Sequence, residues 1–239
     1  MTQIRRVDTA IILAAGRGQR LRPITDSIPK PLIKVGPRTL LEYHLENLIE
    51  AGFRRVVINL SHLGEQISEF LGDGGQFGIE IAYSWEPPGA LETAGGIRHA
   101  LELLDAEQFM AINGDIRCSI GLDELMLPEQ SSMHLVLVPN PSHNPAGDFA
   151  VDSSYTPLRL RDPASRATTY TFSGIGLYRK SIFSSLPDRV QPLAPVIREQ
   201  IKSGLVTAQI HDGAWFDIGT PKRLEAARRA YPAQAPESQ

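Results

Sequence analysis

The chain has 239 residues, of which 42% are hydrophobic and 21% are charged, and this composition excludes a fibrous or disordered protein. Its 24 Lys and Arg residues against 27 Asp and Glu residues give a net charge of −3, so no overall positive field draws it to nucleic acid or to an anionic membrane. The single cysteine excludes an internal disulfide and a cysteine-rich zinc site, and no apolar run approaches the ~20 residues of a membrane span, so we expect a cytoplasmic protein.

Short apolar runs alternate with amphipathic helical patterns through the first half of the chain. Strands are predicted at Thr9–Leu13, Arg55–Leu60, Ile79–Trp85 and Phe109–Asn113. Helices are predicted between them at Leu40–Ala51, Gly64–Leu71 and Thr93–Leu104. The alternation predicts an α/β fold, with a Rossmann-like, mixed but mostly parallel sheet flanked by helices.

After position 115, short strands joined by turns rich in Pro and Asn replace this alternation, which indicates an antiparallel extension of the same sheet. These strands are predicted at Leu135–Pro139, Phe149–Val151, Leu158–Arg161, Thr168–Thr171 and Gly174–Tyr178. They are followed by a helix at Leu193–Lys202, a strand at Val206–Ile210 and a helix at Pro221–Ala230, for which Thr220 is the predicted N-cap. We predict one domain over residues 1–230 and a frayed tail over residues 231–239.

The segment Leu13–Thr25, with the sequence LAAGRGQRLRPIT, directly follows the first predicted strand and allows several interpretations. A dinucleotide-binding turn needs a third glycine where Leu21 stands, and it needs an acidic residue ~20 positions further on, where the chain has none. A P-loop also fails, because no G-x-x-x-x-G-K-[S/T] pattern can be placed on these residues. A clamp for a linear triphosphate and a plain turn with solvated arginines remain open.

The triphosphate interpretation rests on small residues, one arginine and one lysine. Glycines let backbone N–H groups approach phosphate oxygens closely, and alanines leave room for a base or ribose. The loop residues concerned are Ala14, Ala15, Gly16 and Gly18. Arg20 adds a fork of donors suited to phosphate, and Lys30, which stands between two prolines, adds one rigidly aimed charge.

Two carboxylates are candidates to hold the magnesium ion that normally accompanies a triphosphate. Asp115 follows the strand predicted at Phe109–Asn113 and so lies near its carboxyl end, the edge where open α/β sheets bind ligands. Asp217 stands in an aromatic, glycine-containing turn before the last helix. Either residue alone could simply cap a turn, so the magnesium assignment depends on the pair together with the loop.

Five ordered motifs, which span nearly the whole chain, resemble the signature of the sugar-1-phosphate nucleotidylyltransferases. They are Leu13–Thr25 with Pro29–Leu32, Asn113–Asp115, Gly147–Phe149, Phe172–Ile175 and Trp215–Thr220. Within the family, the resemblance is strongest to the bacterial N-acetylmuramate α-1-phosphate uridylyltransferases of cell-wall recycling, through Leu91–Ile97, Asn140–His143 and Gly147–Phe149.

The resemblance implies a role for each matched position. The residues that would face the nucleotide are Gly18, Gln19, Arg20, Lys30 and Gly95. The residues that would contact the sugar phosphate are Glu92, Asn113, Asp148 and Gly174, and the Mg²⁺ ligands would be Asp115 and Asp217. The sequence departs from the pattern at Ala94, where the muramate enzymes carry a third glycine, and at Gln19, where many relatives carry glutamate.

The implied reaction is attack by an oxygen of N-acetylmuramic acid α-1-phosphate on the α-phosphorus of UTP, which expels pyrophosphate. The attacking phosphate has a second pKa near ~6 and is largely dianionic at neutral pH, so the reaction requires no general base. Arg20 and Lys30 would act electrostatically, on the leaving pyrophosphate and on the α-phosphate. The expected partners are therefore a nucleoside triphosphate and a sugar 1-phosphate, with no nucleic acid and no membrane, and the expected state is a monomer.

Two questions stay open. An enzyme for mannose, glucose or heptose 1-phosphate that uses UTP, GTP or dTTP, or a catalytically silent nucleotide-sugar sensor, would carry much of the same pattern. Muramic acid also has a lactyl carboxylate, which a selective pocket should meet with a cation or an N–H group. The candidates by location are His143, Arg159, Arg161 and Arg166.

Overall fold

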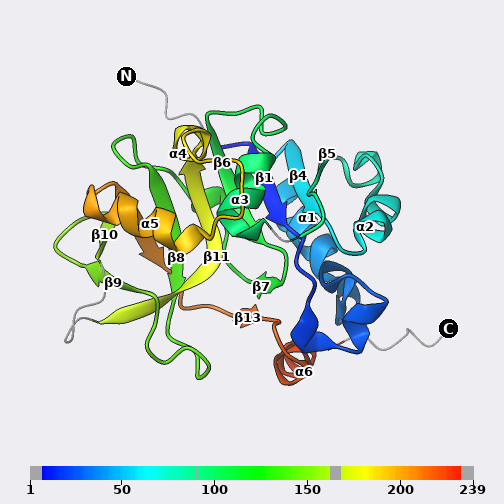
Figure 1. The fold of residues 1–239 in the computed structure, drawn as a ribbon. Coiled ribbons are helices and arrows are strands. Elements are labelled where there is room, and N and C mark those ends of the chain that lie inside the picture. The colour runs from blue at the N-terminus through cyan, green and yellow to red at the C-terminus, as the bar shows by residue number, and fades with distance from the viewer. Residues whose placement is uncertain (1–6, 90, 162–167, 233–239) are drawn as a thin grey trace.

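The computed structural model of the protein describes residues 7–89, 91–161 and 168–232. Its centre is a nine-stranded sheet in the order β5-β4-β1-β6-β11-β8-β12-β10-β9 (Figure 1). Helices cover both faces of this sheet, so the predicted α/β class is confirmed. Within the described ranges, no helix is both long and apolar enough to cross a membrane.

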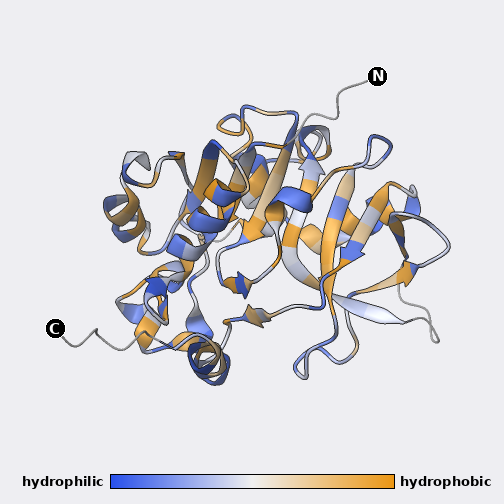
Figure 2. Ribbon diagram, turned by 180° about the vertical axis from the view of Figure 1, so that it is seen from behind, coloured by the Kyte–Doolittle hydropathy of each residue, from blue (hydrophilic) through white to orange (hydrophobic). Residues whose placement is uncertain are grey.

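The first half of the chain forms the parallel part of the sheet. β1 (Thr9–Leu13) lies between β4 (Arg55–Leu60) and β6 (Gln108–Asn113), and β5 (Glu80–Trp85) pairs with the outer side of β4. β1 and β4 match their predicted bounds, because continuous apolar runs between turn residues suit strands buried on both faces. The central strands are accordingly largely apolar in Figure 2.

Two helices cover one face of the sheet and three cover the other. The first face carries α1 (Leu40–Glu50) and α2 (Gly64–Leu71). The second carries α3 (Glu92–His99), α4 (Lys180–Ser184) and α5 (Leu193–Lys202). α3 ends before its predicted limit because the chain from residue 100 to residue 104 forms hydrogen-bonded turns instead.

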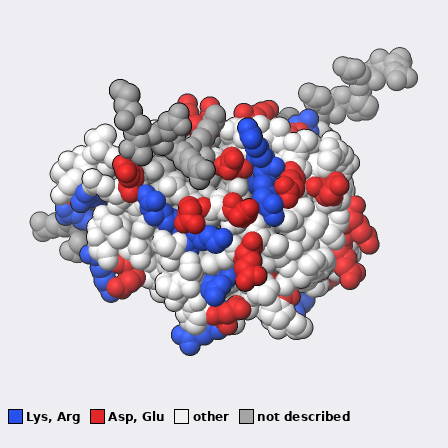
Figure 3. All heavy atoms as spheres, turned by 90° about the horizontal axis from the view of Figure 1, so that it is seen from above, with Lys and Arg blue, Asp and Glu red and all other residues white. Residues whose placement is uncertain are grey.

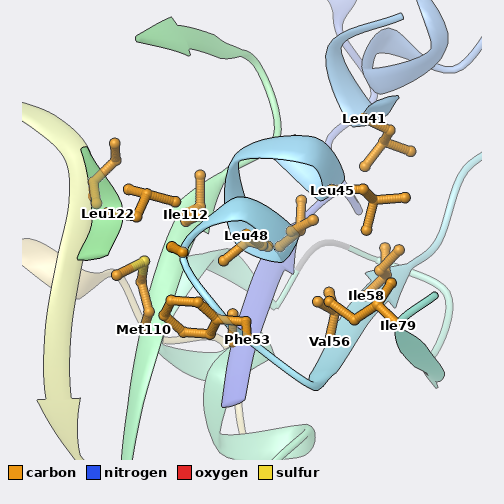
Figure 4. Close-up of a cluster of buried hydrophobic side chains, with 14 of the residues drawn as sticks. Leu41, Leu45, Leu48, Phe53, Val56, Ile58, Ile79, Met110, Ile112 and Leu122 are labelled. Carbon is orange, nitrogen blue, oxygen red and sulfur yellow. The ribbon is translucent and has the colours of Figure 1, made fainter. Parts of the chain in front are cut away.

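α1 illustrates how local sequence and packing agree. Thr39 accepts a hydrogen bond from the Glu42 backbone, and the Glu42 side chain accepts one from the Thr39 backbone, which completes a capping box. Leu41, Leu45 and Leu48 recur at helical spacing and pack against the sheet (Figure 4). Full burial of each leucine contributes about 1.5–3 kcal/mol, so α1 fixes the strands that end at the cleft.

One long strand replaces two predicted ones in the second half. β11 (Thr169–Arg179) runs antiparallel between β6 and β8 (Met133–Val138), where separate strands at Thr168–Thr171 and Gly174–Tyr178 were expected. Its register shifts between Phe172 and Gly176, and Gly174 inside this interval has a φ of 87°. The break in the apolar pattern is therefore a bulge within one strand.

The strands of the second half also close into a ring. β12 (Val206–Ile210) joins β8, β10 (Leu158–Arg161) and β9 (Phe149–Asp152) follow, and β9 pairs back to β11. Among the described strands, the large sheet has four parallel and five antiparallel pairings, so the prediction of a mostly parallel sheet is wrong. Short turns, which reverse the strand direction, replace most of the helical crossovers here.

A two-stranded ribbon that the sequence pattern did not indicate joins distant parts of the chain. β7 (Ile116–Cys118) pairs antiparallel with β13 (Trp215–Asp217). The last helix, α6 (Pro221–Ala230), follows directly, and the Thr220 hydroxyl caps it as predicted. Figure 1 shows the ribbon and α6 below the carboxyl edge of the parallel strands.

The end of the chain packs against its beginning. A small apolar cluster joins α6 to the segment after β1 and contains Leu21, Ile33, Val35, Leu40, Tyr43, Ile218, Leu224 and Ala227. Tyr231 packs its ring against Phe216 and against the guanidinium of Arg117, so this residue is not part of a frayed tail. Residues 233–239, the rest of the predicted tail, lie outside the described residues.

The remaining short elements lie in the connections. The small strands are β2 (Lys34–Val35) and β3 (Arg38–Thr39), which pair with each other. The 3₁₀ helices are η1 (Gln19–Leu21), η2 (Ile24–Asp26), η3 (Lys30–Leu32), η4 (Gly75–Phe77) and η5 (Leu122–Glu124). Three of them lie between β1 and β2, so the loop of the first motif is locally ordered.

Candidate active site

A cleft of about 330 Å³ opens at the carboxyl ends of the parallel strands β1, β4 and β6. Eight of the predicted site residues line it, namely Ala14, Ala15, Gly16, Gly18, Lys30, Glu92, Asn113 and Asp115. The volume is typical of small-molecule sites, which measure about 300–1,000 Å³. The topology therefore places the cleft where open α/β sheets bind ligands.

The loop after β1 forms one wall of the cleft. Gly18 has a φ of 62°, a conformation that side chains disfavour, and its carbonyl accepts a hydrogen bond of 2.9 Å from the Thr25 hydroxyl. No atom outside the loop lies within 4 Å of the point where a Cβ would stand on Gly16, so the backbone there is open to a ligand. These features suit close approach of a phosphate to backbone N–H groups.

Two residues that the sequence analysis missed form the floor of the cleft. Asn59 at the end of β4 is only 3% exposed, accepts a hydrogen bond of 2.6 Å from the Ala14 backbone and donates one of 2.7 Å to Glu86. Glu86 follows β5 and accepts a second hydrogen bond from the Leu91 backbone. Both residues are polar and lie at the end of a strand that the sequence predicted, and this position could have identified them as candidate site residues.

The N-terminal end of α3 closes the opposite side of the cleft. Glu92 lines the cleft and has a φ of 60°, which is rare for a residue with a side chain and recurs at ligand sites. Gly95 faces elsewhere: its N–H donates to the Gln191 carbonyl, and the Arg189 carbonyl lies 2.6 Å from the point where its Cβ would stand. Gly95 therefore allows the segment before α5 to pack on α3 and does not line the cleft.

Lys30 and Asp115 meet across the cleft. They form a direct ion pair, and the lysine side chain is only 11% exposed. Asn113 lies beside them at the end of β6, and its amide lies 2.7 Å from the point where a Cβ would stand on Gly174. Gly174 thus makes room for Asn113 instead of lining the cleft itself.

The β7–β13 ribbon brings Asp217 to the same edge as Asp115. The Ile218 N–H donates a hydrogen bond of 2.9 Å to the Asp115 carbonyl, so the two aspartates stand on directly paired backbones. The Asp217 carboxylate is 25% exposed, lies 3.0 Å from Arg223 Nη1 and lies 3.4 Å from His143 Nε2. Each aspartate therefore has an ion-pair partner, Lys30 for Asp115 and Arg223 for Asp217.

The two aspartates suit a magnesium ion. No group of three or more His, Cys, Asp or Glu residues that could hold a metal occurs in the part of the chain that the structure describes. Mg²⁺ needs only one or two carboxylates, since it takes its other ligands from phosphate oxygens and water. Asp115 and Asp217, which stand on paired backbones beside the cleft, could supply such a donor set, although each is ion-paired with a basic side chain in this structure.

The connection between β8 and β9, residues 139–148, carries His143 toward Asp217. Asp148 accepts hydrogen bonds from the Phe172 backbone at 2.8 Å and from Asn144 at 3.1 Å, so it anchors this connection to β11. The His143 ring stacks against Trp215, with a centroid separation of 6.4 Å. Asp148 therefore has a structural role, and it does not line the cleft.

The other cations expected near the sugar lie away from the cleft or are not described. Arg159 covers the Tyr155 ring, and Arg161 forms an ion pair with Asp152. Arg166 lies outside the described residues. Of the three candidates for the lactyl carboxylate that the structure describes, only His143 has a contact with Asp217.

Gln19 and Arg20 lie in η1, just outside the cleft, and both are exposed. Arg20 Nη2 approaches Gly219, which follows the β7–β13 ribbon. The buried neighbour Leu21 anchors η1 to α6 through the third apolar cluster. The packing of Leu21 against residues of the last turn and of α6 therefore holds Arg20 near the residues that follow Asp217.

His44 of α1 lies behind this edge. Its burial lowers its pKa from the ordinary value of 6.5 to about 4, and the nearby charge of Arg117 acts in the same direction. The imidazole is therefore neutral at physiological pH. Within the described chain its Nε2 atom has no hydrogen-bond partner.

Residues 9–234 match the family described as Nucleotidyl transferase. The chain is 46% identical over 227 residues to the N-acetylmuramate alpha-1-phosphate uridylyltransferase of Neisseria meningitidis, and the match covers 92% of this chain and 96% of that one. It is 39% identical over 244 residues to the UTP--glucose-1-phosphate uridylyltransferase of Synechocystis, with 92% of this chain and 62% of that one covered.

A solved structure has the same fold. HddC from Yersinia pseudotuberculosis superposes with a TM-score of 0.72 at 22% identity, over 94% of this chain and 99% of that one. At this level of identity the likeness concerns the fold alone, and it agrees with the family match over nearly the whole length. The family match covers residues 9–234, and the cleft lies at the carboxyl ends of the parallel strands. The chain therefore belongs to the Nucleotidyl transferase family.

Proposed function

We propose that this nucleotidyltransferase transfers a uridylyl group from UTP to N-acetylmuramic acid α-1-phosphate, giving UDP-N-acetylmuramic acid and pyrophosphate in peptidoglycan recycling. The observation that carries the proposal is the 46% identity, over 92% of this chain and 96% of the relative, to the Neisseria enzyme named for that substrate. The cleft supports it, because an open glycine loop, a largely buried lysine and the Asp115 carboxylate suit a nucleoside triphosphate, and Asp217 stands on the backbone strand paired beside Asp115.

On the nucleotide side, backbone N–H groups of the Ala14–Gly18 loop hold the phosphates. Lys30 donates to the α-phosphate as negative charge grows on it, and Arg20 covers the leaving pyrophosphate. The attacking sugar phosphate is already a dianion at neutral pH, so the residues need only position and stabilise charge. Arg20 is exposed, whereas the Lys30 side chain is largely buried, and these positions suit the separate tasks.

Asp115 and Asp217 are the residues that would hold Mg²⁺, which when bound neutralises triphosphate charge and polarises the phosphoryl oxygens. Lys30 balances Asp115 in the structure, and Arg223 balances Asp217. These cations keep two neighbouring carboxylates compatible before the substrate arrives. The ion pair also holds the Lys30 ammonium at the cleft, ready to donate to phosphate.

On the acceptor side, His143 recognises the lactyl carboxylate of muramic acid. The residue lies at Asp217, and its ring is held by stacking on Trp215 and by the connection that Asp148 and Asn144 anchor. A ring N–H directed toward the sugar site would donate to a carboxylate that glucosamine lacks. The contact would favour muramate over otherwise similar sugars.

A second candidate acceptor is glucose 1-phosphate. The 39% identity to the Synechocystis enzyme favours it, although the match covers only 62% of that longer chain. Both candidates use the same nucleotide chemistry and the same cleft residues. The difference between them concerns the acceptor side alone.

A pyrophosphate-release panel tests the proposal. UTP, GTP, CTP and dTTP are each combined with the 1-phosphates of N-acetylmuramic acid, N-acetylglucosamine, glucose and mannose in the presence of Mg²⁺. We expect the highest kcat/KM for UTP with the muramic acid phosphate. A highest value for glucose 1-phosphate would establish the second candidate, and the absence of release in every combination would support the nucleotide-sugar sensor.

The proposed partners are small molecules only. Basic and acidic side chains are interspersed across the centre of the face in Figure 3, which gives a polyanion such as nucleic acid no continuous positive surface there. We propose that the enzyme acts in the cytoplasm, where both substrates would occur, and that it acts as a monomer. Sedimentation of the purified chain at several concentrations would test the monomer.

A further inference from the structure

Two guanidinium groups lie together beside the cleft, and the function proposed above uses only one of them. The Nη2 atoms of Arg20 and Arg223 both lie within 3.1 Å of one point, the position that a Cβ would take on Gly219. The two arginines come from opposite ends of the sequence. The apolar cluster that contains their neighbours Leu21 and Leu224 brings them together.

This pair has no carboxylate that neutralises both members. Arg223 Nη1 lies 3.0 Å from Asp217, but Arg223 Nε and Nη2 are buried and have no hydrogen-bond partner among the described residues. Arg20 makes no ion pair or hydrogen bond through its side chain within the described ranges. Like charges at close range repel, and buried donors without acceptors destabilise a structure, so an anion bound between the two guanidinium groups would be favourable.

The position of Arg223 in its helix also favours an anion at this site. Arg223 stands in the first turn of α6, and this turn contains no acidic residue. The positive end of the helix dipole therefore adds to the charge of the two arginines instead of opposing it. A cation placed there is unfavourable for the helix alone, and an anion bound between the arginines would reverse that effect.

The cluster is also in the right place for one part of the substrate. Arg20 follows Gly18 of the phosphate loop by two positions, and Gly219 follows the ribbon that bonds to the Asp115 backbone. A triphosphate with its α-phosphate at Lys30 would extend its β- and γ-phosphates past the loop toward the two arginines. Guanidinium groups suit that target because each offers a fork of donors to phosphate oxygens.

We propose that Arg223 is a second pyrophosphate-binding residue, which together with Arg20 holds the β- and γ-phosphates and then the leaving pyrophosphate. The inference rests on the proposed nucleotidyl transfer at this cleft and adds a residue to it. Gly219 is part of the same pyrophosphate site, because any side chain there would occupy the space of the Arg223 guanidinium. The alternative is that Arg223 serves only to balance Asp217.

The test measures binding of inorganic pyrophosphate, with Mg²⁺ at saturating concentration, by isothermal titration calorimetry. Arg223→Gln should weaken pyrophosphate binding about 10- to 100-fold, the range for loss of a charge-assisted hydrogen bond. Lys222→Gln is the matched control: it removes the same charge from the neighbouring position of α6, and Lys222 is exposed. We expect the control to bind pyrophosphate within about twofold of the wild type.

Gly219→Ala provides a second test that keeps every charge. Its φ lies outside the left-handed region, so alanine fits the backbone, and the added methyl must displace the Arg223 guanidinium. We expect weaker pyrophosphate binding with an unchanged circular dichroism spectrum. Pyrophosphate affinity within twofold of the wild type in both variants would overturn the inference and leave Arg223 as a partner of Asp217 alone.

The two proposals fail in different ways. If the wild type releases pyrophosphate with a sugar phosphate but both variants bind pyrophosphate normally, the transfer function stands and the role of Arg223 is refuted. If the wild type neither binds pyrophosphate nor releases it in any combination, both proposals fail together. Loss of binding by Lys222→Gln to the same extent as by Arg223→Gln would also refute the specific role, because it would indicate a general charge effect.

Discussion

The cleft and the proposed acceptor side next to it are built in different ways. The proposed nucleotide side is the cleft itself, which consists mainly of one loop, Ala14–Gly18, and of the carboxyl ends of parallel strands that lie next to each other in the sheet. The proposed acceptor side depends on residues 139–148, which are anchored to β11, and on the β7–β13 ribbon, which pairs positions about a hundred residues apart. Sequence motifs at strand ends therefore indicate the first side, whereas the second side depends on the pairing of strands too short to carry a periodic pattern.

This difference predicts where each kind of specificity lies. In the proposed function, the nucleotide side carries the transfer chemistry, since it contains the Ala14–Gly18 loop, Lys30 and Asp115. The acceptor side can change with one connection, because His143 reaches Asp217 only through the anchored segment 139–148. Changes on the first side should lower activity with every sugar, and changes on the second side should alter the choice of sugar.

The largest expected effect belongs to Lys30 on the nucleotide side. Lys30→Ala should lower turnover by ~10²–10³, the scale for loss of one preorganised donor, with every sugar phosphate alike. Steady-state pyrophosphate release measures the effect, and Lys34→Ala, at an exposed lysine of β2, is the control. A Lys30→Ala enzyme at near wild-type rate would remove this residue from the mechanism.

An Asn59 variant tests whether the hydrogen bonds of Asn59 stabilise the fold as well as the nucleotide site. Asn59→Ala leaves the Ala14 N–H and Glu86 without their buried partner, so the free energy of unfolding should fall by about 1–3 kcal/mol. Affinity for UTP should fall in the same variant, because the loop loses its anchor. Asn47→Ala in α1 is the control, and equal stability of both variants in urea would contradict the role of Asn59.

His44 gives the nucleotide side a pH dependence. Its pKa is about 4 in the folded protein and 6.5 ordinarily, so the unfolded chain takes up a proton first as the pH falls. The stability from the neutral ring is complete above pH 6.5 and decreases toward pH 4, by at most about 1.4 kcal/mol per pH unit. Urea unfolding of His44→Phe over this range should show a smaller slope, and an unchanged slope would contradict the assignment.

The smallest effect is expected on the acceptor side. His143→Gln should reduce the preference for muramic acid over N-acetylglucosamine phosphate by less than about tenfold, since a single hydrogen bond at a partly exposed position contributes about 1 kcal/mol. The ratio of kcat/KM for the two sugars measures it, and the KM for UTP should stay constant. His62→Gln is the control. A changed KM for UTP with a constant sugar ratio would place His143 on the nucleotide side.

The sequence predicted the first half well because its signals are local. β1, β4 and α2 have their predicted bounds, since apolar runs and helical spacing between turn residues determine them directly. Six of the eight predicted residues that line the cleft lie at or just after a strand end or belong to the loop after β1, and Lys30 in η3 and Glu92 at the start of α3 are the other two. Asn59 and Glu86 were missed, although they follow predicted strands in the same way.

In the second half the sequence predicted the bounds of β10, α5, β12 and α6, but it did not predict which strands pair, because those contacts are long-range. β7 and β13 have three residues each, too few for a periodic pattern, yet their pairing brings Asp217 to Asp115. The position of Gly95 depends on the segment before α5 that covers it, and the role of Asp148 depends on β11. The sequence indicated that these residues belong together, but not which of them faces the ligand.

The most direct test of the two-sided cleft is hydrogen–deuterium exchange with a non-hydrolysable UTP analogue and Mg²⁺, without any sugar phosphate. The account predicts slower exchange in the loop of residues 14–21 and in η3, with residues 139–148 unchanged until a sugar phosphate is added. Slower exchange in residues 139–148 with the nucleotide alone, and none in residues 14–21, would contradict the central claim that the loop after β1 holds the triphosphate.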